Sequence, residues 1–275
     1  ELEPDIAFNL LVDFDGVAIY DQHVVGYLEL LRKRYTGCNP RGMMLARDKG
    51  LSKEILGYHR IRSPGFAVFP VGKKVQKPAK LAYPLVVKSL NEEASLGISQ
   101  ASLVTSDEKL KERVEFMHQT FEVDVIAEEY VEGREISLAL LGNGEPRAFP
   151  AWELDLSRLP KRAPRFATAR VKWDLAYQRR HAIRSRPAQL PPPLAGRLAR
   201  LGRRAYALLG LSGYARIDVR LREDGTPFVL EANPNPDLSR ADDFARGAAA
   251  AGLGYEDLVE RILRLGIAYH RAWYL

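Results

Sequence analysis

Residues 213–236 read Gly-Tyr-Ala-Arg-Ile-Asp-Val-Arg-Leu-Arg-Glu-Asp-Gly-Thr-Pro-Phe-Val-Leu-Glu-Ala-Asn-Pro-Asn-Pro, and this stretch decides the fold class. In its first half, apolar Ile217, Val219 and Leu221 alternate with charged residues, which predicts a strand with one buried face. Asp224-Gly225 is a strong signal for a two-residue turn into a second strand. The stretch therefore predicts an antiparallel β-hairpin with one charged face.

Pairing across that turn sets two carboxylates face to face. A two-residue turn places Asp218 opposite Glu231, and Arg216 opposite Asn233. Facing carboxylates repel each other because their Cβ atoms are only ~5 Å apart. A shared proton or a neighbouring arginine would relieve the repulsion, and Mg²⁺ relieves it best because it prefers hard oxygen ligands. We therefore predict a metal site at Asp218, Glu231 and Asn233, against the alternative of a hairpin whose charges face water.

Outside the hairpin, strand and helix patterns alternate, which predicts an α/β or α+β fold. Residues 158–193 are irregular, basic and dotted with proline, and so long a connection is usually a functional lid. We expect strands at residues 5–11, 85–87, 123–131 and 135–141, and helices at residues 24–31, 47–58, 107–121, 194–209 and from 244 onward.

Lys88 ends the short apolar run Leu85-Val86-Val87 and precedes a loop of small and polar residues that closes at Gly97. A positive charge and backbone N–H groups therefore meet there, which suits the phosphates of a nucleotide. The loop lacks the Gly-x4-Gly-Lys-Ser/Thr spacing of a Walker A motif, so taken alone it is a weak signal.

The composition is ordinary for a globular enzyme, with 46% hydrophobic and 28% charged residues in a chain of 275. No apolar run approaches the ~18 residues that cross a bilayer, so no membrane contact is expected. The single cysteine, Cys38, excludes an internal disulfide and fits the cytoplasm. Because the sequence begins at Glu1 without a Met, we expect the natural chain to be longer.

The net charge of +6 makes nucleic acid the first partner to consider. Part of the excess comes from Arg197, Arg200 and Arg203, which follow a helical pattern with an apolar opposite face. Such a pattern is typical of a solvated helix face, and a phosphate-rich small ligand accounts for the rest. We therefore expect small-molecule partners and no nucleic acid.

The order of these motifs resembles that of the D-alanine–D-alanine ligases and their relatives in the ATP-grasp superfamily. The resemblance covers nearly the whole chain and keeps the spacing between motifs. It rests on Asp48-Lys49, Val86-Val87-Lys88, Ala94-Ser95-Leu96-Gly97, residues 128–135, Lys172-Trp173, Arg216-Ile217-Asp218 and residues 230–234. It implies an ATP-grasp fold with a remnant N-terminal domain (residues 1–45), a central subdomain (46–128) and a C-terminal subdomain with the metal site (129–275).

The same resemblance implies the cofactors ATP and Mg²⁺, with two ions held by Asp218, Glu231 and Asn233. Arg216 would steady the transferred phosphoryl group, and Lys172 would lie in the loop that closes over the phosphates. The residues implied to bind the nucleotide are Lys49 and Lys88 at the phosphates, Ser95 and Gly97 in the phosphate loop, Glu128 and the backbone of Val131 at the adenine, and Glu135 at the ribose.

The activity implied is ligation of a small-molecule carboxylate to an amine. A carboxylate does not react with an amine, because its charge repels the nucleophile and oxide is a poor leaving group. Phosphorylation by Mg-ATP gives an acyl phosphate, whose leaving group is phosphate. The site must exclude water to protect that intermediate, which fits a lid. We allow for a homodimer of the chain.

The chain departs from the family pattern near the acceptor. Family members have Gly after the proline that follows the metal ligands, and later a Ser that helps to hold the acceptor carboxylate. This chain has Asp237, Ser239 and then Asp242-Asp243. Carboxylates repel an acceptor carboxylate, so we assign Asp237, Ser239 and Asp242 to the substrate and expect an acceptor other than D-alanine. Alternatively, Asp242 and Asp243 merely cap the next helix.

A second departure lies in the lid, where Ala94 and Trp173 replace a hydrogen-bonded Ser and Tyr of the family. This pair indicates an apolar contact in place of a polar one. Two other functions remain open: an orthodox D-alanine–D-alanine ligase of cell-wall synthesis, and a non-catalytic ATP-binding module. Retention of the metal-binding residues argues against the module.

Overall fold

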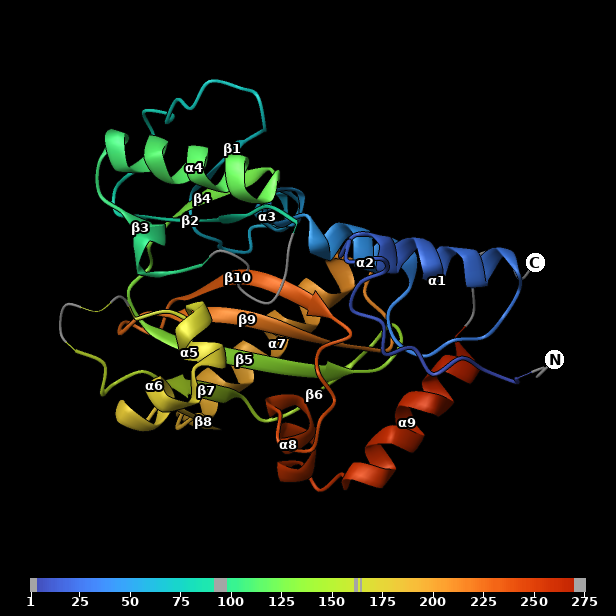
Figure 1. Cartoon of the computed structure of the whole chain (residues 1–275). Helices are drawn as coiled ribbons and strands as arrows, with labels where there is room; N and C mark the ends of the chain where they lie inside the picture. Colours follow the sequence, from blue (N-terminus) through green and yellow to red (C-terminus); the bar gives the residue numbers. More distant parts are fainter. Residues whose placement is uncertain (1–3, 92–97, 161–162, 164, 270–275) are drawn as a thin grey trace.

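Two antiparallel sheets with helices on their faces form the structure, a computed structural model that describes residues 4–91, 98–160, 163 and 165–269 (Figure 1). One sheet has the strand order β1-β4-β2-β3. The other has the order β10-β9-β5-β7-β8, with β6 paired to β5. This mixture confirms the predicted α/β (α+β) class. The division at residues 45 and 128 stays a prediction.

The helices of the described residues have the following bounds: α1 (Tyr20–Leu30), α2 (Pro40–Arg47), α3 (Lys49–Tyr58), α4 (Asp107–Phe121), α5 (Ala169–Trp173), α6 (Leu175–Arg180), α7 (Pro192–Leu208), α8 (Asp243–Ala250) and α9 (Tyr255–Ala268), with a 3-10 turn at Gln100–Ser102. The strands are β1 (Phe66–Phe69), β2 (Leu85–Ser89), β3 (Leu103–Val104), β4 (Val125–Glu129), β5 (Arg134–Leu141), β6 (Arg147–Ala148), β7 (Trp152–Asp155), β8 (Arg184–Pro187), β9 (Tyr214–Leu221) and β10 (Pro227–Pro234).

The four-stranded sheet is covered by α4, and together they bury an apolar cluster of their own. This cluster includes Leu85, Val87, Leu110, Val114, Met117 and Val125. The helix begins at residue 107 as predicted, and Ser106 caps it, since its hydroxyl accepts from the backbone N–H of Lys109. The sheet therefore holds the end of β2, and with it Lys88, on a rigid frame.

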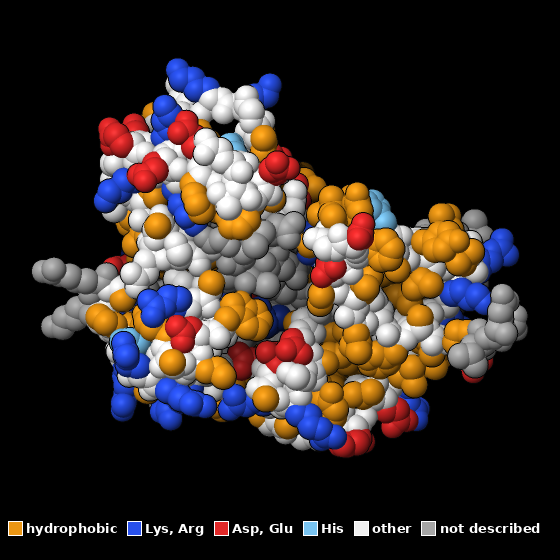
Figure 2. Space-filling model, in the orientation of Figure 1, with side chains coloured by type: hydrophobic (Ala, Val, Ile, Leu, Met, Phe, Trp, Pro, Cys, Tyr) orange, Lys and Arg blue, Asp and Glu red, His pale blue; other side chains and the backbone are white. Residues whose placement is uncertain are grey.

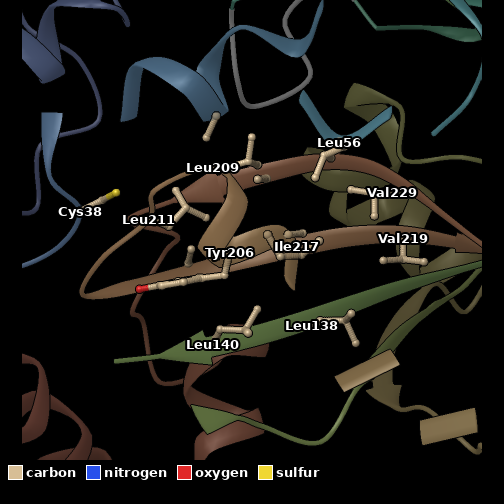
Figure 3. Packing of buried hydrophobic residues seen from close by; sticks show 14 of the residues in the cluster. Cys38, Leu56, Leu138, Leu140, Tyr206, Leu209, Leu211, Ile217, Val219 and Val229 are labelled. Atoms are coloured by element: carbon tan, nitrogen blue, oxygen red, sulfur yellow. The ribbon is translucent and has the colours of Figure 1, made fainter. Parts of the chain in front are cut away.

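The larger sheet has one apolar face and one charged face at β9. Ile217 and Val219 of β9 pack with Val229 of β10 and with Tyr206 of α7 (Figure 3). Because side chains alternate along a strand, the even-numbered residues of β9 lie on the opposite face. The predicted alternation is thus confirmed, and it presents the charged residues away from the core.

The hairpin has the predicted register at Asp218 and Glu231, but its turn differs from the prediction. Its turn has three residues rather than two, because the N–H of Arg222 donates to the carbonyl of Thr226 (3.0 Å). Near the turn, Val219 therefore pairs with Val229, one residue out of the predicted register. A β-bulge between Val229 and Glu231 restores the register. The turn prediction was wrong, whereas the pairing of Asp218 with Glu231 is confirmed.

Three other local predictions need correction. Residues 5–11 form no strand beyond an isolated bridge from Ala7 to Tyr35. The helix expected at residues 47–58 begins two residues later, as α3, because Asp48 is extended (ψ 100°) and its carboxylate caps α3 through the N–H of Leu51. Arg47 instead ends α2, a helix that was not predicted. The strand expected at residues 123–131 is limited to β4, which is shorter at both ends.

The segment at residues 158–193 is more regular than expected. It contains α5 and α6, whose first turns are capped by Thr168 and Asp174, and the edge strand β8, which pairs with β7. Basic side chains gather over α6 and β8, at the lower left of Figure 2. The function of this segment as a lid stays a prediction. Within the described residues, no helix is long and apolar enough to cross a membrane.

Candidate active site

A chain of alternating charges joins the two sheets. Lys53 Nζ of α3 lies 2.9 Å from Glu128 Oε1 of β4, and Lys88 Nζ of β2 lies 3.2 Å from Glu128 Oε2. Lys88 Nζ also lies 3.5 Å from Glu231 Oε2 of β10. Two lysines therefore alternate with two carboxylates, and the predicted phosphate ligand Lys88 contacts the predicted metal ligand Glu231 directly.

The charges around Glu231 create a positive field at this point. Burial alone would raise the pKa of Glu231, but Lys88, Lys49, Lys172 and Lys53 together hold it well below its usual range. Glu231 is therefore ionised at neutral pH. Lysines from α3, β2 and α5 converge on one carboxylate, and such a concentration of positive charge suits a polyphosphate.

Arg216, Asp218 and Asn233 form a second cluster on the charged face of β9 and β10. The Arg216 guanidinium donates two hydrogen bonds to the Asp218 carboxylate, from Nε to Oδ1 at 2.8 Å and from Nη2 to Oδ2 at 3.0 Å. Asn233 Nδ2 donates to Asp218 Oδ2 at 2.9 Å. Burial would lower the pKa of Arg216, but the neighbouring carboxylate of Asp218 outweighs that effect and raises the pKa, so the guanidinium stays charged.

The donor set of Asp218, Glu231 and Asn233 fits Mg²⁺, because it consists of hard oxygen donors on one face of a hairpin. Rotation of the Asn233 amide would present its oxygen instead of its nitrogen. Among the described residues, no group of three or more His, Cys, Asp or Glu side chains could hold a metal unaided. In the usual Mg²⁺ site, substrate phosphates and water complete the shell of ligands.

Glu135, the residue assigned to the ribose, pairs with an arginine that the sequence analysis missed. Arg220 Nη2 lies 3.0 Å from Glu135 Oε2, and Arg220 Nη1 donates to the carbonyl of Arg165 at 2.9 Å. Arg220 also donates to the carbonyl of Gly133. Residue 133 must be glycine, because its φ is +149° and an added Cβ would lie 2.2 Å from the carbonyl oxygen of Leu221. Arg220 therefore connects Glu135 to the start of the proposed lid segment.

The other predicted nucleotide residues are placed as follows. Lys49 is buried at the start of α3, and its Nζ lies 3.5 Å from the carbonyl of Leu90. Lys172 is half-buried in α5, and Val131 is half-buried directly beyond β4. Both oxygens of Glu128 face lysines, so its assignment to the adenine stays a prediction. Ser95 and Gly97, and with them Ala94, lie outside the described residues.

The acceptor residues fall into two groups. Asp237 and Ser239 are exposed, and Asp237 Oδ1 accepts from the Ser239 N–H at 2.7 Å. Asp242 is half-buried and caps α8 through the Phe244 N–H at 3.3 Å, as the capping alternative expects. Burial raises the pKa of Asp242, and the charge of Arg216 opposes that rise. Asp242 therefore lies within electrostatic reach of the Arg216 cluster.

Lys53 and Arg220 are the charged residues that the sequence analysis passed over. Lys53 follows Lys49 by one helical turn, so both lie on the same side of α3. Arg220 continues the even-numbered face of Arg216 and Asp218. The spacing of both residues could have indicated that they lie on the same faces as the site residues. Their partners could not be predicted, because Glu128 and Glu135 belong to strands distant in the sequence.

Two antiparallel sheets with a shared cluster of lysines and carboxylates agree with an ATP-grasp ligase, and the comparisons with known proteins show this class. The family model described as D-ala D-ala ligase C-terminus matches residues 50–264, and the chain belongs to this family. It is an ATP-dependent carboxylate–amine ligase, and such a ligase works with ATP and Mg²⁺.

Relatives agree with this assignment. The chain is 32% identical over 269 residues to an uncharacterized protein, y4sG, of Sinorhizobium fredii, covering 98% of this chain and 76% of the relative. It is 31% identical over 245 residues to the D-alanine–D-alanine ligase of Bordetella petrii, covering 88% of this chain and 71% of the relative.

Solved structures share the fold. The D-alanine–D-alanine ligase of Bacillus anthracis complexed with ATP matches with a TM-score of 0.72 and 25% identity, over 89% of this chain and 74% of that one. The VanG D-Ala:D-Ser ligase of Enterococcus faecalis matches with a TM-score of 0.78 and 22% identity, over 96% and 74% of the two chains. The latter likeness concerns the fold alone.

Proposed function

We propose that this ligase phosphorylates a small carboxylate with Mg-ATP and passes the acyl group to an amine other than D-alanine. The observation that carries the acceptor proposal is Asp242, a half-buried carboxylate within electrostatic reach of Arg216. A negative charge at that point repels an acceptor that bears its own carboxylate. It favours a basic amine, or an amine that carries no carboxylate.

The residues of the site support the phosphorylation step. Lys49 and Lys88 bind and orient the phosphates, and Arg216 steadies the phosphoryl group as it leaves ATP. Asp218, Glu231 and Asn233 would hold Mg²⁺, which would supply positive charge to neutralise the phosphates. Neutralisation of the phosphate charge would let the anionic carboxylate approach the γ-phosphorus.

The lid segment supports the second step, in which the amine attacks the acyl phosphate. Lys172 in α5 adds to the positive field at Glu231, so the phosphates attract this segment. Closure over the site would exclude water, which otherwise hydrolyses the acyl phosphate. The proposal includes two Mg²⁺ ions and a homodimer, and native mass spectrometry of the nucleotide-bound protein counts both.

ADP release with a panel of substrates tests the proposed function. D-alanine alone would be assayed first, followed by carboxylates paired with amino acids and with basic amines. We expect no turnover with D-alanine alone, and turnover with a pair that contains a basic or carboxylate-free amine. Turnover with D-alanine alone would identify an orthodox D-alanine–D-alanine ligase. Tight ATP binding without turnover on any pair would favour a non-catalytic module.

The substitution Asp242→Ser is expected to shift the acceptor preference toward amines that carry a carboxylate. Removal of the repulsion should raise their kcat/KM, relative to that of basic amines, by about tenfold or more, the equivalent of ~1.4 kcal/mol. Serine can still cap α8, so the fold should be unaffected. The matched control is Asp257→Ser, in the exposed first turn of α9. An unchanged preference in the Asp242 variant would contradict the acceptor proposal.

A further inference from the structure

The charged face of β10 depends on the bulge at Leu230. Before the bulge, Val229 pairs with Val219 on the core face; after it, Glu231 pairs with Asp218. If the strand had no bulge and kept all its residues, the register near the turn would continue and Glu231 would lie opposite Ile217. Its carboxylate would then point into the apolar core against α7. The placement of a predicted metal ligand therefore rests on one irregularity of the strand.

A bulge leaves its extra residue without a regular partner in the ladder, so the backbone groups there need other partners. Lys53 meets this need because its Nζ donates to the carbonyl of Leu230. The N–H of Val229 donates to the carbonyl of Arg62, just beyond α3, at 2.8 Å. Helix α3 packs beside β10 (Figure 1), so Lys53 of this helix and Arg62 of the segment after it bond to the strand at Leu230 and Val229.

We infer that Lys53 is a positioning residue that fixes the bulge of β10, so that Glu231 faces Asp218, and that orients Lys88 through Glu128. The reference to the metal site rests on the proposed function. The contacts themselves do not, because Lys53 contacts the carbonyl of Leu230 and the carboxylate of Glu128 directly.

Burial distinguishes this role from direct binding of phosphate. The side chain of Lys53 is 1% exposed, that of Glu128 5%, that of Lys88 10% and that of Glu231 23%, so exposure rises along the chain of charges. Lys53 therefore occupies the deepest position and already serves a carboxylate and a carbonyl. Its effect on a ligand must pass through Glu128, Lys88 and the backbone of β10.

The side chains also balance in charge, which explains how two lysines and two carboxylates remain buried together. A buried charge is tolerated when it is paired and hydrogen-bonded. Removal of Lys53 alone would leave Glu128 to Lys88, which would be drawn away from Glu231. Removal of Lys53 would therefore loosen the bulge and displace Lys88, and both effects would disturb Glu231.

Hydrogen–deuterium exchange of Lys53→Met tests the inference in the protein without nucleotide. We expect exchange at residues 228–233 to rise about tenfold or more, since a hydrogen bond from a charged donor is lost. The enhancement of ADP binding by Mg²⁺, measured by calorimetry, should fall by a similar factor, while ADP binding without metal changes less. Because exchange requires neither ligand nor turnover, the inference can fail independently of the proposed function.

Two further variants keep the test decisive. Lys53→Met combined with Glu128→Gln removes the unpaired buried charge, so this variant should fold even where the single variant does not, and it should retain the rapid exchange in β10. Arg47→Met breaks the buried ion pair of Arg47 with Asp21 and is the matched control. It should lower stability without changing either readout. Unchanged exchange at residues 228–233 in the Lys53 variants would overturn the inference.

Discussion

The Asp218→Asn variant is expected to lose ligation, with kcat lowered by at least about 10³-fold, which corresponds to ~4 kcal/mol of transition-state stabilisation. Asp218 faces Glu231 across the hairpin and receives two bonds from Arg216. Asparagine keeps the shape of the side chain but removes the negative charge that both the metal and Arg216 require. Steady-state ADP release with the preferred substrate pair measures the effect.

The control for this variant is Asp224→Asn in the turn of the same hairpin. Asp224 is exposed, and its side chain accepts from the N–H of Thr226 at 2.8 Å, a bond that asparagine can also accept. We expect the control to keep full activity, and the Asp218 variant to keep its fold by circular dichroism. Normal turnover by a folded Asp218→Asn enzyme would refute the metal assignment.

The Arg216→Lys variant is expected to lower kcat by about 10²–10³-fold, the usual effect of losing one group that stabilises charge in the transition state. Lysine keeps the positive charge, but it cannot form the paired bonds by which the guanidinium is fixed to Asp218. The KM for ATP should change much less, because the proposed phosphate ligands, Lys49 and Lys88, are unaltered in this variant. Separate measurement of kcat and KM distinguishes these effects.

Arg197→Lys on α7 is the matched control for this variant, since Arg197 is exposed and donates to the carbonyl of Gly225 in the hairpin turn. It should leave both constants unchanged. If Arg216→Lys retained the kcat of the unaltered enzyme, the oriented guanidinium would have no part in the chemistry, and the assignment of Arg216 would fail.

The hairpin illustrates how far periodicity can predict a site. The alternation of apolar and charged residues identified the charged face of β9. Counting outward from an assumed two-residue turn placed Asp218 opposite Glu231. The turn has three residues, yet the pairing is right because the bulge at Leu230 compensates by one position. The bulge itself was not predictable, since it depends on Lys53, a residue far away in the sequence.

The missed residues share a physical cause. Lys53 and Arg220 are buried charges, and burial of a charge is tolerated only with partners that tertiary structure supplies. Their partners, Glu128 and Glu135, lie on other elements. Local pattern also failed at Asp48, where a carboxylate that caps α3 interrupts an otherwise continuous helical periodicity. Long-range pairing and local capping both lie outside what hydrophobic spacing can predict.

The acceptor site shows what a family pattern adds and where it stops. The motif order predicted the fold and the class of ligase, and both are confirmed. The departures at Asp237 and Asp242 could be seen only against that pattern. The structure places Asp242 as both the cap of α8 and a neighbour of Arg216, so the two interpretations of this residue are compatible.

Transfer of ¹⁸O from the carboxylate to phosphate tests whether this ligase forms an acyl phosphate. The carboxylate of the most active pair in the substrate panel would be labelled with ¹⁸O and incubated with Mg-ATP and its amine, and the released phosphate would be analysed by mass spectrometry. Formation of an acyl phosphate predicts one ¹⁸O atom in each phosphate, together with an amide product. Phosphate without label would mean that water attacks ATP, and this result, or ADP release with no pair at all, would contradict the account.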